Sequence, residues 1–269
     1  MPFVERDRCR VHWEAVGAGS PVLLIMGAVY SSRMWHPTVP ALSKHHQVIT
    51  FDNRGTGKST ATRVASIADM ARDALAVLDA AGAETAHVYG ASLGGVVALE
   101  LAFQAPQRVR SLILGCTGIL SADKPRAPRA VNTMLRVVPR SVRVSSTKYG
   151  SACPPERAAA NQAVLRDDVA KRRALVAQQN ALRAYSADPA AVATLDVPAL
   201  VLHGTEDPIV PIVWGRELAD TLPNSCLITY EGAGHNYVAE MGEESNNDVI
   251  AFLASVDAEA AEADLGRAL

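Results

Sequence analysis

Six short apolar runs constrain the fold of this chain more than any other feature of its sequence. Each run is mainly apolar along its whole length, and Gly, Pro, Asp or Asn residues bound it. The runs are Val22 to Met26, Val48 to Phe51, His87 to Tyr89, Ser111 to Leu114, Ala199 to Leu202 and Cys226 to Tyr230. Continuous apolarity is typical of strands that are buried on both faces. The runs therefore predict a parallel sheet covered by helices.

Helical patterns lie between these runs. Residues 66–81 repeat apolar positions at helical spacing and stop at Gly82, and residues 213–222 and 246–256 show similar patterns. Strands that alternate with helices predict a doubly wound α/β sheet. A chain of 269 residues with 49% hydrophobic content can bury one full core, so we expect a single domain with an insertion.

The insertion is expected where the alternation of strands and helices breaks. After Leu114-Gly115 no clear strand pattern follows until residues 198–202, and the residues between are rich in Arg, Ala and Pro. Helical patches at 157–166 and 168–183 have too few apolar residues to form a core of their own. We therefore expect a core of residues 1–117 and 197–258, an inserted helical lid of residues 118–196, and a C-terminal tail of residues 259–269. The Ala- and Glu-rich residues 257–264 are expected to be the frayed end of the last helix.

The stretch Y-G-A-S-L-G-G contains Ser92 between a predicted strand and a predicted helix. Glycine and serine are common in such turns for conformational reasons alone, so the G-x-S-x-G pattern does not decide the role of Ser92. A nucleophilic serine in this context sits on a sharp strand-to-helix turn, beside the N–H groups of the helix N-terminus. It also requires a base, and a third group that orients the base.

One candidate acid and one candidate base follow later strands. The run Ala199 to Leu202 leads into H-G-T-E-D-P, which contains Asp207, and the run Cys226 to Tyr230 leads into E-G-A-G-H-N-Y, which contains His235. Loops at the carboxyl ends of strands are where α/β sheets build their sites. The order Ser92, Asp207, His235 is the order of the nucleophile, acid and base in the α/β-hydrolase arrangement.

From Val11 to Val256 the chain resembles the serine-nucleophile branch of the α/β-hydrolase superfamily. Three further segments carry this resemblance: L-L-I-M-G-A-V-Y-S-S-R-M-W, I-T-F-D-N-R-G-T-G-K-S and H-G-T-E-D-P-I-V-P. They are similar to the loop after the family's third strand, its D-x-R-G-x-G-x-S loop and its acid loop. The resemblance implies that Ser92, Asp207 and His235 are catalytic, and that the backbone N–H groups of Ala28 and Leu93 form the oxyanion hole.

One loop departs from the usual family pattern. Met26-Gly27 stands where the loop after the third strand commonly reads His-Gly. With Met26-Gly27 at this position, the loop resembles that of the aclacinomycin methylesterase-like enzymes of natural-product pathways. Backbone donors do not depend on a histidine at position 26, so the departure affects the support of the loop rather than its existence.

Each candidate also has a structural interpretation. Ser92 and His235 are alternatively ordinary loop residues, and Asp207 is alternatively a helix cap with Glu206 as a rival acid. His203 is expected in the core or behind the site. Asp52-Asn53-Arg54-Gly55 is expected to be a buried turn that braces the active-site loops. Gly55 to Ser59 lacks the spacing of a phosphate-binding loop, so no nucleotide is expected.

Charge gives no global indication of a partner. The 26 basic and 28 acidic residues nearly balance, which favours neither nucleic acid nor a membrane surface. Residues 121–173 are locally basic, with twelve Lys or Arg against four Asp or Glu. This segment is either a solvated helical surface or a surface that steers an anionic substrate or an acidic carrier protein; the residues proposed for steering are Arg126, Arg129, Arg136, Arg140 and Arg143.

The termini and the cysteines indicate a cytoplasmic protein. The N-terminal residues show no signal-peptide pattern, and no apolar run approaches the roughly 20 residues that cross a bilayer. Cys9, Cys116, Cys153 and Cys226 lie far apart without C-x-x-C spacing, so neither a zinc site nor a disulfide framework is expected.

These patterns predict a cofactor-independent serine hydrolase that cleaves a carboxylic ester or lactone of a small molecule. Candidates for the substrate pocket are Tyr30, Trp35, Met134, Leu135 and Trp214, with core packing as the alternative for both tryptophans. A second hypothesis is a natural-product lyase that expels acetate or another leaving group, or an enzyme that cleaves a carbon–carbon bond, with the same triad. A third is a ligand receptor with a vestigial triad.

Overall fold

The computed structural model describes residues 2–60, 66–122, 149–166, 168 and 172–268. One eight-stranded sheet has the order β1-β2-β4-β3-β5-β6-β7-β8. Its strands are β1 (Phe3–Arg6), β2 (Cys9–Val16), β3 (Pro21–Ile25), β4 (Gln47–Phe51), β5 (Ala86–Ala91), β6 (Val109–Gly115), β7 (Ala199–Gly204) and β8 (Ser225–Tyr230). The six strands from β3 to β8 are parallel, and they are the six that the apolar runs predict.

The first two strands are not predicted by the apolar runs. β1 pairs antiparallel with β2, and β2 pairs antiparallel with β4. Charged residues such as Glu5, Arg10 and Glu14 interrupt their sequences. The two strands form one end of the sheet, where part of each strand meets solvent, so they need no continuous apolar run.

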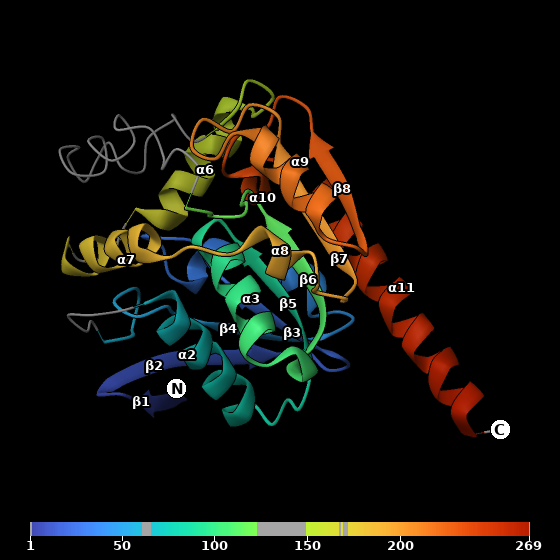
Figure 1. Ribbon diagram of the computed structural model, residues 1–269. Coiled ribbons are helices and arrows are strands. Elements are labelled where there is room, and N and C mark those ends of the chain that lie inside the picture. Colours follow the sequence, from blue (N-terminus) through green and yellow to red (C-terminus); the bar gives the residue numbers. More distant parts are fainter. Residues whose placement is uncertain (1, 61–65, 123–148, 167, 169–171, 269) are drawn as a thin grey trace.

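Helices cover both faces of the sheet (Figure 1). Alternate residues of β3 point to opposite faces, since Leu23 and Ile25 join one hydrophobic cluster and Val22 and Leu24 join the other. The first cluster includes residues of α2 (Ile67–Ala80), α3 (Leu93–Gln104) and α9 (Ile212–Thr221), and the second includes residues of α1 (Val39–Leu42) and α11 (Gly242–Ala268). The expected doubly wound α/β architecture is confirmed.

The helix boundaries follow local chemistry where caps are present. Ser66 and Asp69 form a capping box at the start of α2, and the chain turns after the helix at Gly82, whose φ is +69°. The last helix is longer than residues 246–256, because α11 runs from Gly242 to Ala268 and extends past the sheet (Figure 1). The predicted division into core and tail at residue 258 therefore falls inside one continuous helix.

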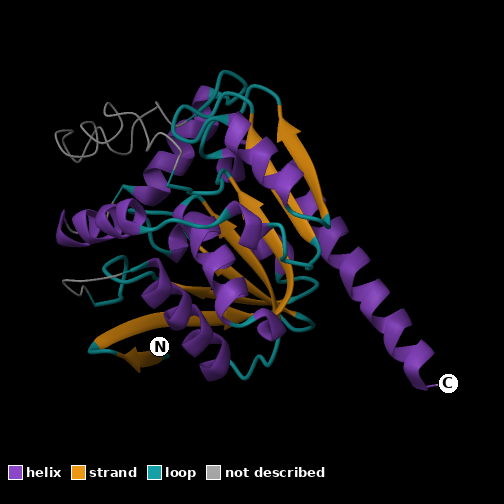
Figure 2. Cartoon of the chain, in the orientation of Figure 1, coloured by secondary structure: helices purple, strands orange, loops and turns teal. Residues whose placement is uncertain are grey.

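The segment between β6 and β7 contains α6 (Pro155–Leu165), α7 (Arg172–Ala184) and α8 (Pro189–Val192). α6 packs against α10 (Tyr237–Glu240), which follows β8, and against a short 3-10 helix, η1 (Ser32–Trp35), which follows β3. Figure 2 shows α6 and α7, at the positions labelled in Figure 1, on the side to which the parallel strands point. In the described part of the chain, no helix combines the length and apolar character needed to cross a bilayer.

Candidate active site

Ser92 lies in a sharp turn between β5 and α3. Its φ of 55° and ψ of −118° form a backbone conformation that non-glycine residues rarely adopt. Two glycines make room for the turn. A Cβ on Gly94 would lie 1.9 Å from the carbonyl oxygen of Ile25, and one on Gly90 would lie 2.2 Å from the carbonyl oxygen of Gly94. The sequence around Ser92 therefore fits the close packing that the turn requires.

Backbone and side-chain bonds from the neighbouring strand hold this turn. The Ser92 N–H donates to the Gly115 carbonyl at 2.8 Å, and the Thr117 hydroxyl donates to the Ser92 carbonyl at 3.0 Å. Both partners follow from the position of β6 beside β5. Thr117 was not among the predicted site residues, because nothing in its local sequence indicates a contact with Ser92.

Asp207 and His235 meet Ser92 from the loops after β7 and β8. His235 Nδ1 lies 2.7 Å from Asp207 Oδ2, and His235 Nε2 lies 3.1 Å from Ser92 Oγ. With the carboxylate ionised, Nδ1 donates to Asp207 and the unprotonated Nε2 accepts from the serine hydroxyl. The three residues that the sequence singles out thus form one continuous hydrogen-bonded chain.

The Asp207 side chain is fully buried and is held as a carboxylate. Burial raises the pKa of Asp207, but the adjacent His235 and several hydrogen bonds outweigh burial and hold the pKa well below its usual range. His203 lies buried at the end of β7, and its Nε2 is 2.9 Å from the Val210 carbonyl oxygen and 3.5 Å from Asp207 Oδ2. It therefore stands behind the acid, as expected.

The second oxygen of Asp207 closes a local turn. Asp207 Oδ1 accepts from the N–H groups of Ile209 and Val210 at 2.8 and 2.9 Å. These bonds do not cap α9, because that helix begins at Ile212 with Pro211 as its N-cap residue. Glu206, the rival acid, instead accepts bonds from the N–H and hydroxyl of Ser151 at 2.7 and 2.8 Å.

Leu93 and the loop after β3 both lie beside Ser92. Leu93 is the first residue of α3, so its N–H has no acceptor within the helix. The loop after β3 passes close to the serine, since a Cβ on Gly27 would lie 3.7 Å from Ser92 Oγ. Ala28 comes next in this loop. The Asn53 side chain donates to the Met26 carbonyl at 2.7 Å and supports the loop where other family members carry histidine.

A buried carboxylate that the sequence did not indicate lies behind His235. Glu240 has no exposed surface, and its Oε2 accepts from the N–H groups of Gly234 and Gly150, both at 2.9 Å. Burial raises the pKa of Glu240 in spite of these bonds. The residue thereby ties the loop that carries His235 to the start of the described segment before α6.

The Asp52-Asn53-Arg54 turn is buried and braces neighbouring loops, as expected. Asp52 Oδ1 accepts from the N–H and hydroxyl of Ser32 at 2.9 and 2.8 Å. Arg54, however, pairs with Asp73 of α2 rather than with Asp52, with its Nη2 2.7 Å from Asp73 Oδ1. The turn therefore links the loop after β3 to α2.

The candidates for the substrate pocket occupy different surroundings. Trp35 is fully buried with its ring centroid 4.7 Å from that of Tyr89, which corresponds to the core-packing alternative. Tyr30 is buried, and burial together with the Asp168 charge raises the pKa of Tyr30 to about 12. Trp214 is partly buried and packs over Gly118. Met134, Leu135 and the five arginines proposed for steering lie outside the described residues.

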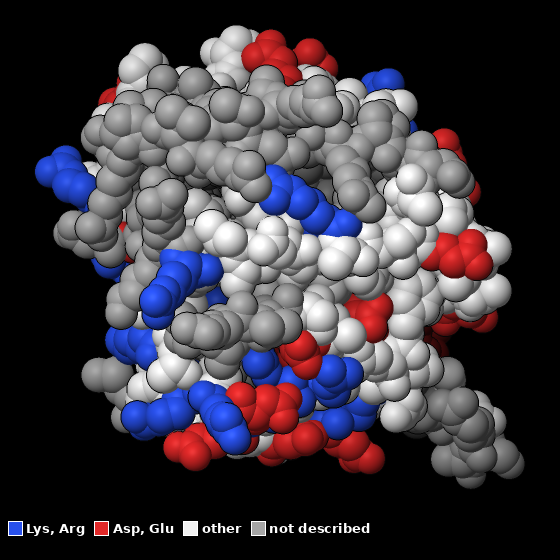
Figure 3. Space-filling view, turned by 60° about the vertical axis from the view of Figure 1, so that its left-hand side comes forward, with Lys and Arg blue, Asp and Glu red and all other residues white. Residues whose placement is uncertain are grey.

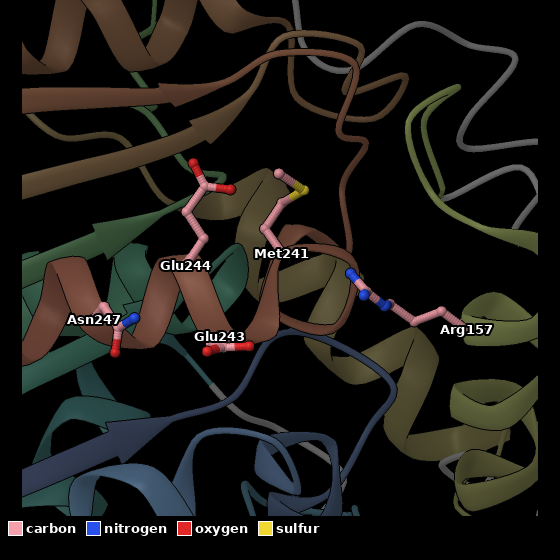
Figure 4. A pocket seen from close by; sticks show the side chains of 5 residues that line it. All are labelled: Arg157, Met241, Glu243, Glu244 and Asn247. Carbon is pink, nitrogen blue, oxygen red and sulfur yellow. The ribbon is translucent and has the colours of Figure 1, made fainter.

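Charges on the described surface are mixed. Figure 3 shows basic and acidic side chains side by side on the lower part of one face. A cavity of about 340 Å³ lies between α6 and the junction of α10 with α11 (Figure 4). Arg157 of α6 lines it together with residues of that junction, and none of the triad residues does. The described residues contain no group of three or more His, Cys, Asp or Glu that could hold a metal ion.

Known proteins resemble this chain over most of its length. A family model described as the alpha/beta hydrolase fold matches residues 20–240. An Azorhizobium caulinodans protein named "Putative carbamate hydrolase RutD" is 32% identical, covering 96% of this chain and all of that protein. A Mycobacterium tuberculosis protein named "Putative non-heme bromoperoxidase BpoC" is 30% identical, covering 90% of this chain and 97% of that one.

Solved structures agree with the sequence comparisons. The enol-lactonase from Burkholderia xenovorans LB400 superimposes with a TM-score of 0.80 at 25% identity, covering 94% of this chain and all of that one. Est816, described as an N-acyl homoserine lactone degrading enzyme, superimposes with a TM-score of 0.82 at 25% identity, covering 93% of this chain and all of that one. The fold, the family model and the relatives agree, and the chain belongs to the α/β-hydrolase family of enzymes.

Proposed function

We propose that this protein is a serine hydrolase that cleaves a carboxylic ester or lactone of a small molecule. The observation that carries the proposal is the hydrogen-bonded chain from Asp207 through His235 to Ser92, with contacts of 2.7 and 3.1 Å. Two relatives named for lactone substrates and one named for a carbamate support it, since these substrates all bear a carbonyl carbon bonded to a heteroatom.

The mechanism follows from the positions of these groups. His235 Nε2 takes the hydroxyl proton of Ser92 while Oγ attacks the carbonyl carbon, and the N–H groups of Ala28 and Leu93 stabilise the resulting oxyanion. Asp207 keeps the ring of His235 in the required tautomer and stabilises its protonated form. His235 then protonates the leaving oxygen, and a water molecule activated by His235 hydrolyses the acyl enzyme.

A second candidate reaction rests on the Met26-Gly27 loop. This loop resembles that of aclacinomycin methylesterase-like enzymes, which suggests a role in secondary metabolism such as antibiotic biosynthesis. In a lyase of such a pathway, His235 would remove a substrate proton and a leaving group would depart without an acyl enzyme. The same three side chains serve either reaction. The two reactions differ in whether an oxygen atom from water enters the product.

The test combines covalent labelling with an isotope experiment. A fluorophosphonate probe is expected to label the wild-type protein and not Ser92→Ala. A panel of neutral and anionic esters, lactones and acetylated alcohols then identifies a substrate. In water enriched in oxygen-18, hydrolysis incorporates one labelled oxygen into the carboxylate product. A Ser92→Ala variant with full activity would refute the mechanism, and turnover without incorporated label would favour elimination.

A further inference from the structure

The loop that carries the proposed oxyanion donor contains a strained residue. Val29, which follows Ala28, has a φ of +84° and is almost fully buried. Positive φ is rare for β-branched residues, and such a strained conformation persists only where the surrounding structure enforces it. Something outside residues 26–31, which we term the oxyanion loop, must therefore hold Val29 in this conformation.

A glutamine on α7 holds it. The Val29 N–H donates to Gln178 Oε1 at 3.0 Å, and Gln178 Nε2 donates to the Arg54 carbonyl at 3.4 Å. The two partners fix the amide orientation, because a backbone N–H requires the oxygen and a backbone carbonyl requires the nitrogen. Gln178 has no exposed surface, so water does not compete for these bonds.

A second residue of the same inserted segment holds the end of the oxyanion loop. Asp168, between α6 and α7, accepts from the Ser31 N–H at 2.9 Å and from the Ser31 hydroxyl. The carboxylate is nearly buried, and burial raises its pKa while the bonds from Ser31 lower it. Charge-assisted bonds in such surroundings are among the stronger hydrogen bonds in proteins.

Residues beyond Ser31 are tied to α6 as well. His36 Nε2 lies 2.6 Å from the Asn161 amide oxygen, and Arg33 donates to the Val164 carbonyl at 2.8 Å. From the sheet side, the oxyanion loop receives the Asn53 bond at Met26. The Ala28 peptide thus lies between one support from the sheet and one from the segment between β6 and β7.

From this arrangement we propose that Gln178 is a positioning residue for the oxyanion hole, so that a helix of the inserted segment sets the rate of acyl transfer. The inference rests on the proposed hydrolase function. The bond from the Val29 N–H to Gln178 also occupies the N–H group next to that of Ala28. The Ala28 N–H is thereby left as the donor that this loop offers to the oxyanion. Without Gln178, Val29 relaxes toward negative φ and displaces the Ala28 peptide from the oxyanion.

The test compares two adjacent glutamines on one helix. Gln178→Met removes both hydrogen bonds while keeping the length of the side chain. Gln179→Met is the matched control, because Gln179 is also buried and its Nε2 has no partner among the described residues. Loss of one oxyanion donor costs about 10²–10³ in kcat. Partial displacement of Ala28 in Q178M is therefore expected to lower kcat roughly 10- to 100-fold, with KM within about threefold.

Two further measurements separate positioning from general damage. An alkyl boronic acid, which forms a tetrahedral adduct with serine, should bind Q178M more weakly by the same factor as the loss in kcat, whereas a product carboxylate should bind unchanged. Gln178→Glu keeps the acceptor for Val29 and loses the donor to Arg54. Its kcat should fall by less than the roughly 10- to 100-fold expected of Q178M, and this comparison with the wild type does not depend on how Q178M folds.

The outcomes are distinct. Equal kcat values for Q178M and Q179M would overturn the inference while leaving the proposed hydrolase intact. A higher KM with unchanged kcat in Q178M would also overturn the inference, because that pattern indicates lost ground-state binding. An inactive wild type on every acyl substrate, unlabelled by the fluorophosphonate, would instead refute the proposed function itself.

Discussion

In the described part of the molecule, histidine joins a serine to an aspartate in two hydrogen-bonded chains, and only one of these chains has the surroundings of an active site. The second chain links Ser111 Oγ to His87 Nδ1 at 2.7 Å and His87 Nε2 to Asp257 Oδ1 at 3.0 Å. Ser111 and His87 are paired residues of β6 and β5, and Asp257 belongs to α11. Residue types and bond lengths therefore do not by themselves define a catalytic triad.

The differences between the two chains lie in exposure and in the neighbouring backbone. Ser111 and His87 have no exposed surface, and Ser111 sits within a strand, away from any helix N-terminus. Ser92 is partly exposed at the start of α3. Asp257 also binds Arg110 at 2.9 Å and Ser20, so its carboxylate serves to fasten α11 to the sheet. We expect the Ser92 chain to govern activity and the Ser111 chain to govern stability.

The largest expected effect separates the two serines. Ser92→Ala should lower kcat by a factor of about 10⁴–10⁶, because triad serines in other enzymes contribute on this scale. Ser111→Ala should leave kcat within about twofold and lower the free energy of unfolding by about 1–3 kcal/mol, because it leaves the buried His87 Nδ1 without its partner. Steady-state kinetics and urea unfolding of both variants measure these effects. An inactive but stable Ser111→Ala would contradict the comparison.

The two aspartates give the next contrast. Asp207→Asn should lower kcat by about 10⁴, since an amide favours the wrong tautomer of His235. Asp257→Asn should retain activity but lose about 1–3 kcal/mol of unfolding free energy, because a neutral amide replaces the carboxylate that His87 and Arg110 face. If Asp257→Asn instead matched Asp207→Asn in kcat, the second chain would have to act in catalysis.

Glu240 offers a smaller effect within the active site. Glu240→Gln leaves an amide oxygen for the Gly234 and Gly150 N–H groups but removes the charge that strengthens both bonds, so we expect kcat to fall by about 3- to 30-fold, the equivalent of about 0.7–2 kcal/mol. Glu240→Asp, which is too short to reach both N–H groups, is the control for geometry and should be at least as slow. Unchanged kcat in both would show that the His235 loop does not depend on Glu240.

Acidification tests the buried histidine of the second chain. Burial lowers the pKa of His87 to about 4, against 6.5 for an exposed imidazole. The unfolded chain therefore binds a proton between pH 6.5 and 4 that the folded chain does not, and unfolding free energy should fall as pH falls through that window. Asp257, whose pKa is lowered, acts in the same direction at still lower pH.

A His87→Asn variant isolates this contribution. Because asparagine does not titrate, the slope of unfolding free energy against pH between 6.5 and 4 should decrease by up to one proton relative to the wild type. Urea titrations at several pH values measure the slope. The same slope in both proteins would mean that other groups cause the acid sensitivity.

The features that could be predicted from the sequence are those that depend on short, local residue patterns. The six parallel strands carry the apolar runs, although β8 lies at one end of the sheet and is only partly buried, and each triad residue follows one of these strands in a loop of recognisable composition. The strands β1 and β2 escaped prediction because they form the other end of the sheet, where charged residues interrupt their sequences. The Ala- and Glu-rich residues after position 256 were expected to be the frayed end of the last helix, and α11 continues through them to Ala268.

The supporting residues of the candidate site were not predictable, because their partners are distant in sequence. Gln178 and Val29 are 149 residues apart, and Asp168 and Ser31 are 137 apart. Glu240 lies only five residues after His235, but its partners Gly150 and Gly234 are known only from the fold. A buried polar residue on an amphipathic helix gives no sign of which backbone group it binds.

The Gln178–Val29 bond has a consequence for anyone who redesigns this protein. Helices next to an active site are natural targets for redesign, and α7, which contacts the oxyanion loop through Gln178, would be exchanged or shortened for that purpose. Such an exchange would remove an acceptor for a backbone group in the catalytic loop. Selectivity and turnover would then change together, unless a glutamine is retained at position 178 in the new helix.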